Sequence, residues 1–162
     1  MKLIRSGKAQ LTFSVGKREK RLLFQLLKLY PLVPPVHHKL SKTAEGAGHD
    51  ENQRLLEESL AEQRRENRKQ VLAMLEEPGR FREKDDGFEF SLKHPQVEWL
   101  LQVLNDIRVG AWLELGEPEW REMPEINETN APYLFAMEGA GHFESDLLEA
   151  LGVRNPPPYG GE

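Results

Sequence analysis

The stretch LTFSVGKREKRLLFQLL, residues 11–27, has a close counterpart in FEFSLKHPQVEWLLQVL, residues 88–104. In each stretch the first five residues alternate between apolar and polar side chains, which is the pattern of a strand with one buried face. The apolar residues that follow recur every three or four positions, which is the spacing of an amphipathic helix. Each stretch therefore predicts a strand that continues directly into a helix.

The similarity extends towards the N-terminus, so that residues 3–27 align without gaps with residues 80–104. The identical pairs are Arg5/Arg82, Phe13/Phe90, Ser14/Ser91, Leu23/Leu100, Gln25/Gln102 and Leu27/Leu104. Gly7 and Gly87 lie in turn-forming segments just before the two strands, and short apolar-bearing segments come before these turns. We interpret the pattern as an internal repeat of a hairpin followed by a helix, in units of about 3–30 and 80–116.

The fold predicted from these units is α+β, mainly helical, with a small antiparallel sheet. A single hairpin is marginally stable in water, so the two hairpins are expected to join and to be covered by their helices. Residues 50–77 contain neither Gly nor Pro and predict a long helix, whose polar centre either crosses solvent or divides the helix in two. A last helix is expected at about 131–151, where Gly139 and Gly141 could divide it.

The domain organisation expected from length is one domain over residues 1–154. The segment at 36–48 shows no periodicity and is expected to be a mobile loop, and the proline-rich residues 155–162 a flexible tail.

The composition excludes several classes of protein. The chain has no cysteine, which excludes disulfides, thiol catalysis and cysteine-ligated zinc. No window approaches the roughly 20 apolar residues that cross a bilayer, and no signal peptide is evident. We therefore expect a cytoplasmic protein without membrane association.

Charge is unevenly distributed along the chain. Residues 1–49 carry ten basic and two acidic residues (+8), whereas residues 50–162 carry 12 basic and 25 acidic residues (−13). The cluster Lys17, Arg18, Lys20 and Arg21 is the strongest basic patch. It either packs near acidic elements of its own chain or meets an anionic partner. Nucleic acid is a disfavoured partner, because the chain is acidic overall and has no recognised reading motif.

Motifs for catalysis are missing from the sequence. There is no phosphate-binding loop, nucleophile elbow or zinc-protease motif. Glu138, His142 and Asp146 follow each other at four-residue spacing, which on a helix would make half of a metal site. Glycines interrupt this spacing, and the remaining candidates for a second ligand set are His37, His38 and His49. We therefore predict neither a metal nor another cofactor.

The polar residues Asn105, Asp106 and Arg108 interrupt a strongly apolar run and are the candidate binding residues. A half-buried charge needs a partner, so Arg108 either pairs with a carboxylate of its own domain or recognises a ligand or partner. The surrounding segment LLQVLNDIRVGAWLELG, residues 100–116, resembles an uncharacterised family of small bacterial helical proteins, some of them encoded near the adaptor of the Clp protease. The resemblance implies a link to proteolysis and no assigned activity.

The function expected from these observations is that of a non-enzymatic cytoplasmic protein that acts through contacts with an unknown protein partner. One alternative is an enzyme with a site near Asp106 and Arg108. Another is nucleic-acid binding through the basic N-terminal segment. A homodimer could form through the sheet edges or the long helix.

Overall fold

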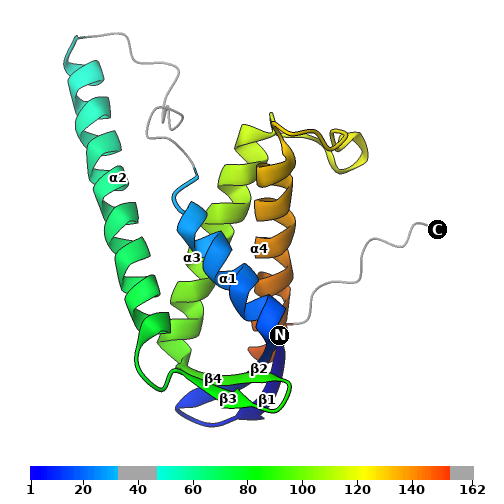
Figure 1. Cartoon of the computed structure of the whole chain (residues 1–162). Helices are drawn as coiled ribbons and strands as arrows, with labels where there is room; N and C mark the ends of the chain where they lie inside the picture. Colours follow the sequence, from blue (N-terminus) through cyan, green and yellow to red (C-terminus); the bar gives the residue numbers. More distant parts are fainter. Residues whose placement is uncertain (33–46, 154–162) are drawn as a thin grey trace.

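The computed structural model describes residues 1–32 and 47–153, and all structural statements below concern these residues (Figure 1). In chain order the elements are β1 (Lys2–Ser6), β2 (Gln10–Gly16), α1 (Lys17–Leu29), α2 (Ala47–Glu76), β3 (Phe81–Lys84), β4 (Gly87–Lys93), α3 (His94–Glu114), the short 3₁₀ helix η2 (Trp120–Glu122) and α4 (Ala131–Ala150). The predicted fold class is confirmed, because helices dominate and the strands form one small antiparallel sheet.

The sheet has the strand order β1-β2-β4-β3, so that the two hairpins meet through β2 and β4. Phe13 pairs with Phe90 at the centre of this junction. On either side of it, Leu11 pairs with Leu92 and Val15 pairs with Phe88. In the sequence alignment Leu11 corresponds to Phe88 and Val15 to Leu92, so the two pairs are equivalent to each other. The register is therefore symmetric about the Phe13–Phe90 pair.

The two helices that follow the hairpins also begin in the same way. Glu19 on α1 accepts a hydrogen bond from the backbone N–H of Gly16 at 2.9 Å, and Gln96 on α3 accepts one from the N–H of Lys93 at 2.9 Å. This is the return half of a capping box, in which the third helical residue satisfies a donor that the helix leaves free. Pro95 lies in the first turn of α3, where its missing N–H costs nothing.

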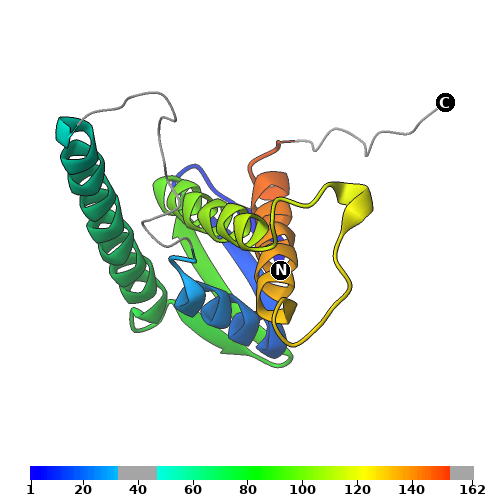
Figure 2. The same ribbon diagram turned by 90° about the horizontal axis from the view of Figure 1, so that it is seen from above.

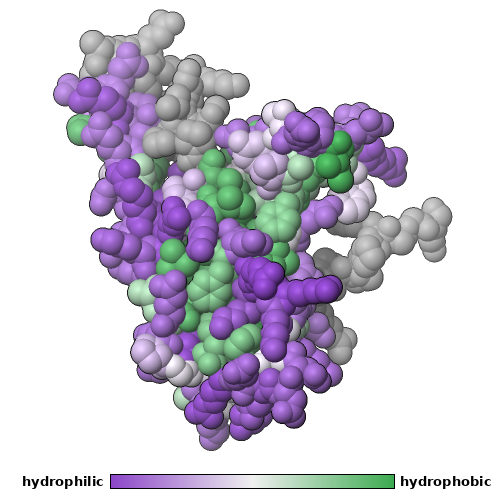
Figure 3. All heavy atoms as spheres, in the orientation of Figure 1, coloured by the Kyte–Doolittle hydropathy of each residue, from purple (hydrophilic) through white to green (hydrophobic). Residues whose placement is uncertain are grey.

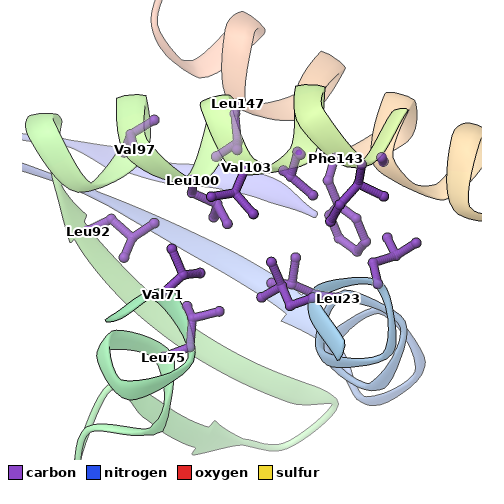
Figure 4. Packing of buried hydrophobic residues seen from close by; sticks show 14 of the residues in the cluster. Leu23, Val71, Leu75, Leu92, Val97, Leu100, Val103, Phe143 and Leu147 are labelled. Carbon is purple, nitrogen blue, oxygen red and sulfur yellow. The ribbon is translucent and has the colours of Figure 1, made fainter. Parts of the chain in front are cut away.

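The core lies between the sheet and the helices. Figure 4 shows Leu23 of α1, Val71 and Leu75 of α2, Leu92 of β4 and Leu100 of α3 pointing toward one another. Phe143 and Leu147 of α4 close the same cluster and are fully buried. Burying a side chain of this size contributes about 1.5–3 kcal/mol. One core therefore joins the two hairpins to all four long helices.

Helix α2 is continuous through its polar centre, so the predicted long helix is confirmed without a break. It begins at Ala47 rather than at the expected residue 50, and its 30 residues span about 45 Å. The buried apolar residues of α2 are Val71, Met74 and Leu75, all near its C-terminal end. Figures 1 and 2 show the rest of the helix standing to one side of the other helices.

Helix α4 is also continuous, although Gly139 and Gly141 lie within it. A Cβ added at Gly139 would lie 3.1 Å from a methyl carbon of Leu26, so the glycine allows α1 and α4 to approach closely. Between α3 and α4 the chain forms an extended connection with one 3₁₀ turn, and Figure 2 shows it projecting beyond the helices. This segment contains Pro118 and Pro124, which disfavour a long helix, and its helical structure is limited to the three residues of η2.

Two sequence-based expectations lie outside the described residues, namely a mobile loop over most of 36–48 and a flexible tail at 155–162. The last residues of that loop segment, Ala47 and Gly48, belong to α2. None of the helices that the structure describes combines the length and the apolar character needed to cross a membrane.

Candidate functional site

Arg108, the central residue of the predicted site, pairs with a carboxylate of its own chain. Its Nε lies 2.9 Å from Oε2 of Glu144 on α4, and an Nη donates to Oδ1 of Asn105 at 3.2 Å. The Glu144 side chain is 10% exposed, whereas that of Arg108 is 49% exposed. The guanidinium is therefore fixed on one side and open to solvent on the other.

The buried carboxylate that holds Arg108 carries an energetic cost. Burial raises the pKa of Glu144 above its ordinary value, and the attraction of Arg108 only partly offsets this. Ionised Glu144 is thus less favourable in the folded protein than in water. The arrangement fixes the position of Arg108 more than it stabilises the fold.

Asp106 lies on a different side of α3 from Arg108, because residues two apart on a helix do not face each other. The hydroxyl of Tyr30, at the end of α1, donates to Oδ2 of Asp106 at 3.1 Å. Burial, followed by the nearby Asp106 carboxylate, raises the pKa of Tyr30 to about 12. The structure therefore brings Asn105 and Arg108 together and gives Asp106 a separate role between α1 and α3.

A polar groove runs between α3 and α4 on the side of Arg108. It encloses about 610 Å³, and its polar lining includes Gln102 and Asn105 of α3 and Glu144 and Ser145 of α4. Leu101 and Leu148 contribute apolar surface to it. Arg108 and Gly141 lie at the end of this groove where a second cavity begins.

The second cavity, also about 610 Å³, is mainly apolar. Its apolar lining residues are Val109, Trp112, Pro118, Trp120, Met123 and Met137. The indole N–H of Trp112 donates to the carbonyl of Pro118 at 3.2 Å, which ties the connection to α3. Trp120 is 89% exposed at the cavity's edge. We call the polar groove and this cavity together the α3–α4 groove.

The surroundings of the apolar cavity are acidic. Glu138 lines the cavity, and the connection from α3 to α4 carries Glu117, Glu119, Glu122, Glu125 and Glu128, all exposed, against Arg121. Such a segregated field attracts basic partners and repels acidic ones. The glutamates of the connection were not assigned to a site from the sequence, because this segment has no periodicity and its neighbours come from both helices.

The four-residue spacing of Glu138, His142 and Asp146 brings only two of these side chains together. His142 and Asp146 are neighbours on α4, with Nε2 and Oδ2 3.6 Å apart, but Glu138 turns to the apolar cavity. The third member of the cluster is Glu19 of α1, and the three ligand atoms lie within 4.8 Å of one another.

The amino group of Met1 contacts both carboxylates of this cluster. It forms ion pairs with Glu19 and, at 3.0 Å, with Oδ2 of Asp146, although the second contact is not an aligned hydrogen bond. The two carboxylates raise the pKa of the Met1 amino group despite its burial. The protonated amino group of Met1 therefore supplies the positive charge that Glu19 and Asp146 require.

The predicted basic patch is found on α1. Lys17, Arg18 and Arg21 are exposed, whereas Lys20 is half-buried, with Nζ 3.9 Å from the ring centroid of Phe88. The aromatic partner comes from β4 and could not be assigned to this patch from the local sequence.

The chain matches no protein-family model, and no match was found among curated proteins or solved structures.

Proposed function

We propose that the protein is a peptide-binding protein whose α3–α4 groove holds a basic, partly apolar segment of a partner protein. The observation that carries the proposal is the exposed indole of Trp120 beside an apolar cavity built from Trp112, Met123 and Met137. Large aromatic side chains next to a cavity are enriched among residues that dominate binding energies. Methionine side chains adapt easily to different apolar ligands.

Charge decides which kind of segment fits best. The glutamates around the cavity favour a ligand with Lys or Arg next to its apolar anchor. Arg108 lies where the polar and apolar parts of the groove meet, and the open side of its guanidinium can donate to a carbonyl oxygen of a bound backbone. Glu144 keeps this donor in place before the ligand arrives, which reduces the ordering cost of binding.

The competing idea of an enzyme at Asp106 and Arg108 receives less support. Each residue has its own partner in the described chain, Tyr30 for Asp106 and Glu144 for Arg108, and the two side chains do not converge.

Three further parts of the proposal rest on the sequence. They are a cytoplasmic location, the resemblance to the bacterial family encoded near the Clp adaptor, and an origin of the two hairpin-helix units by duplication. The duplication is supported by the symmetric register about Phe13 and Phe90 and by the equivalent caps of α1 and α3.

Peptide binding can be tested with two synthetic peptides of 12 residues that lack tryptophan. One carries Leu and Phe flanked by lysines, and the other has glutamate in place of each lysine. Titration of the protein, followed by its tryptophan fluorescence, should show saturable binding of the basic peptide and weaker binding of the acidic one. The emission of Trp120 should shift to shorter wavelength as its indole is covered.

Two variants make the test specific to the groove. Because Trp120→Ala removes the tryptophan that reports binding, the variants are compared by fluorescence anisotropy of a labelled basic peptide. Trp120→Ala should weaken binding at least tenfold, which corresponds to about 1.4 kcal/mol. Ile126→Ala is the matched control, because this exposed side chain is on the same connection but does not line the cavity. The proposal fails if neither peptide binds, if the acidic peptide binds better, or if the two variants behave alike.

A further inference from the structure

A separate groove follows α1 on its basic side. It encloses about 470 Å³ and is lined by the cations Lys17, Lys20, Arg21 and Lys28 together with the rings of Phe24 and Phe88. Among the residues that the structure describes, no acidic side chain lines it. We call it the α1 groove. It lies apart from the α3–α4 groove, which shares none of its lining residues.

The cations of the α1 groove are not neutralised within the part of the chain that the structure describes. The one acidic residue of α1, Glu19, is engaged by the Met1 amino group and by the N–H of Gly16. None of the ion pairs among residues 1–32 and 47–153 involves the four lysine and arginine residues of the groove. Positive charge is thus concentrated along one side of a protein that is acidic overall.

An aromatic cluster forms the apolar part of the same groove. The rings of Phe24 and Phe81 have centroids 5.8 Å apart, and those of Phe81 and Phe88 are 6.3 Å apart and perpendicular. All three side chains are only partly buried. Lys20 lies over Phe81 and Phe88, at 4.5 and 3.9 Å from their centroids. Figure 3 shows apolar surface bordered by hydrophilic side chains on the face that carries α1.

The spacing of the cations suits an extended polyanion. Lys17 and Lys28 are eleven residues apart, which is about 17 Å along the helix, and Lys20 and Arg21 lie between them. A row of cations beside partly exposed aromatic rings is the combination by which proteins hold single-stranded nucleic acid, because the cations follow the phosphates and the rings stack on bases. Base stacking requires unpaired bases, so a duplex could use only the charges.

We infer that the α1 groove binds a short stretch of single-stranded nucleic acid. The phosphates contact Lys17, Arg21 and Lys28, and one or two bases stack against Phe24 and Phe88 after Lys20 moves from the rings. This is a second binding activity, independent of the peptide groove. An acidic protein segment is the competing occupant, and it would use the charges without requiring the rings.

The test is fluorescence anisotropy with a labelled 15-nucleotide oligo-dT and the full chain. Binding should be saturable at low salt and should weaken as salt increases. With about three phosphate contacts, the slope of log K against log salt concentration should be about −2. A hairpin duplex of equal charge and polyglutamate are the competitors, and both should displace the labelled strand much less well than unlabelled oligo-dT.

Matched variants separate charge from stacking. Arg21→Glu should reduce affinity at least tenfold and make the salt slope less steep, whereas Lys69→Glu, the same change at an exposed position of α2, should have little effect. Phe24→Leu, which keeps an apolar side chain in place, should reduce affinity about tenfold through lost stacking. Phe135→Leu, at an exposed aromatic residue on α4, is its control. Circular dichroism checks that each variant is folded.

The outcomes are distinct. Loss of affinity in both Arg21→Glu and Phe24→Leu, with unchanged controls, supports the inference. It is overturned if oligo-dT does not bind at low salt, if the duplex binds as tightly, or if polyglutamate competes equally while Phe24→Leu has no effect. Trp120→Ala should leave oligo-dT binding unchanged, so failure of the peptide proposal and failure of this one are distinguishable.

Discussion

Phe13 on β2 lies directly opposite Phe90 on β4, and their rings stack with centroids 5.4 Å apart. The two residues occupy equivalent positions in the two hairpin-helix units, so the centre of the sheet is also the centre of its symmetry. Phe81 extends the stack from β3, with its ring 4.8 Å from that of Phe90. The junction between the units is therefore held by aromatic packing in the core.

Truncating either central ring should strongly destabilise the protein. Phe13→Ala and Phe90→Ala should each lower the free energy of unfolding by about 3–5 kcal/mol, because both side chains are at most 1% exposed. Urea denaturation measures the loss. Phe135→Ala, which removes a ring that is 43% exposed, should cost much less. In a double-mutant cycle the two central changes should be non-additive by about 0.5–1.5 kcal/mol, and strict additivity would contradict a direct ring contact.

Paired glycines at the end of the β2–β4 junction should respond unequally to an added methyl group. A Cβ at Gly87 would lie 2.4 Å from the carbonyl oxygen of Val15, whereas one at Gly16 would meet its nearest neighbour, Oε2 of Glu19, at 3.5 Å. Gly87→Ala should therefore cost at least about 2 kcal/mol, because backbone must move. Gly16→Ala should cost about 1 kcal/mol or less. Thermal or urea unfolding of the two variants tests this, and equal losses would contradict it.

The Tyr30–Asp106 hydrogen bond should contribute to stability. Tyr30→Phe leaves Oδ2 of Asp106 without this donor and should lower the free energy of unfolding by about 1–2 kcal/mol. Tyr133→Phe, at a half-buried tyrosine on α4, should change it by about 0.5 kcal/mol or less. The loss of unfolding free energy from Tyr30→Phe should be smaller in an Asp106→Ala background, where the acceptor is missing. Equal losses with and without Asp106 would show that the hydrogen bond does not stabilise the fold.

The Met1–Glu19 ion pair predicts a window of pH in which Glu19→Gln is most destabilising. Burial raises the pKa of Glu19, but hydrogen bonds from the Met1 ammonium and the Gly16 N–H outweigh it, so the pKa is lowered overall. Its stabilisation is present above the unfolded value of about 4.3 and is lost as pH falls through the folded pKa. The Met1 pKa is raised, so its contribution is present below about 8 and is lost as pH rises through the folded pKa.

Stability of wild type and Glu19→Gln should therefore differ most between about pH 5 and 8, and the difference should shrink on both sides. Urea denaturation across the pH range measures it. Glu58→Gln removes a similar carboxylate from an exposed pair with Arg54 and should have a small effect throughout. A difference between wild type and Glu19→Gln that is the same at every pH would contradict the role of this pair.

Glu144→Gln should separate stability from binding. Because the pKa of Glu144 is raised, its favourable contribution is present below about pH 4.3 and is lost as pH rises through the folded pKa. Removing the charge should thus leave the free energy of unfolding at pH 7 unchanged or increase it. Binding of the basic peptide should weaken, because a neutral amide holds Arg108 less firmly. A large loss of stability at pH 7 would contradict this account.

The fold could be predicted from the sequence because its determinants are local. Alternation at Leu11, Phe13 and Val15 followed by helical spacing specifies a strand and then a helix, and residues 88–104 carry the same pattern. The helix over residues 50–76 follows from the absence of Gly and Pro there, whereas its continuity through the polar centre was left open by the sequence. Its placement does not follow, since the buried residues of α2 among those whose side chains are described are three, all near its C-terminal end.

The candidate site could be predicted only in part. Arg108 was identified because a charge interrupts an apolar helix, but its partner Glu144 is 36 positions away (144 minus 108) and is supplied by packing of α4. The basic residues of α1 were evident, whereas the ring of Phe88 reaches them only through the pairing of β2 with β4. Such contacts between distant residues leave no periodic pattern in the sequence.

Helix α2 is anchored in the core at one end, and this affects how its residues unfold locally. In the described part of the chain, its buried apolar contacts are made by Val71, Met74 and Leu75. Amide hydrogens near these residues should exchange with solvent only when the core opens. Those in the first five turns should exchange through local fraying of the helix. Hydrogen exchange along α2 should therefore form a gradient, with protection rising toward the C-terminal end, as in a rod clamped at one end.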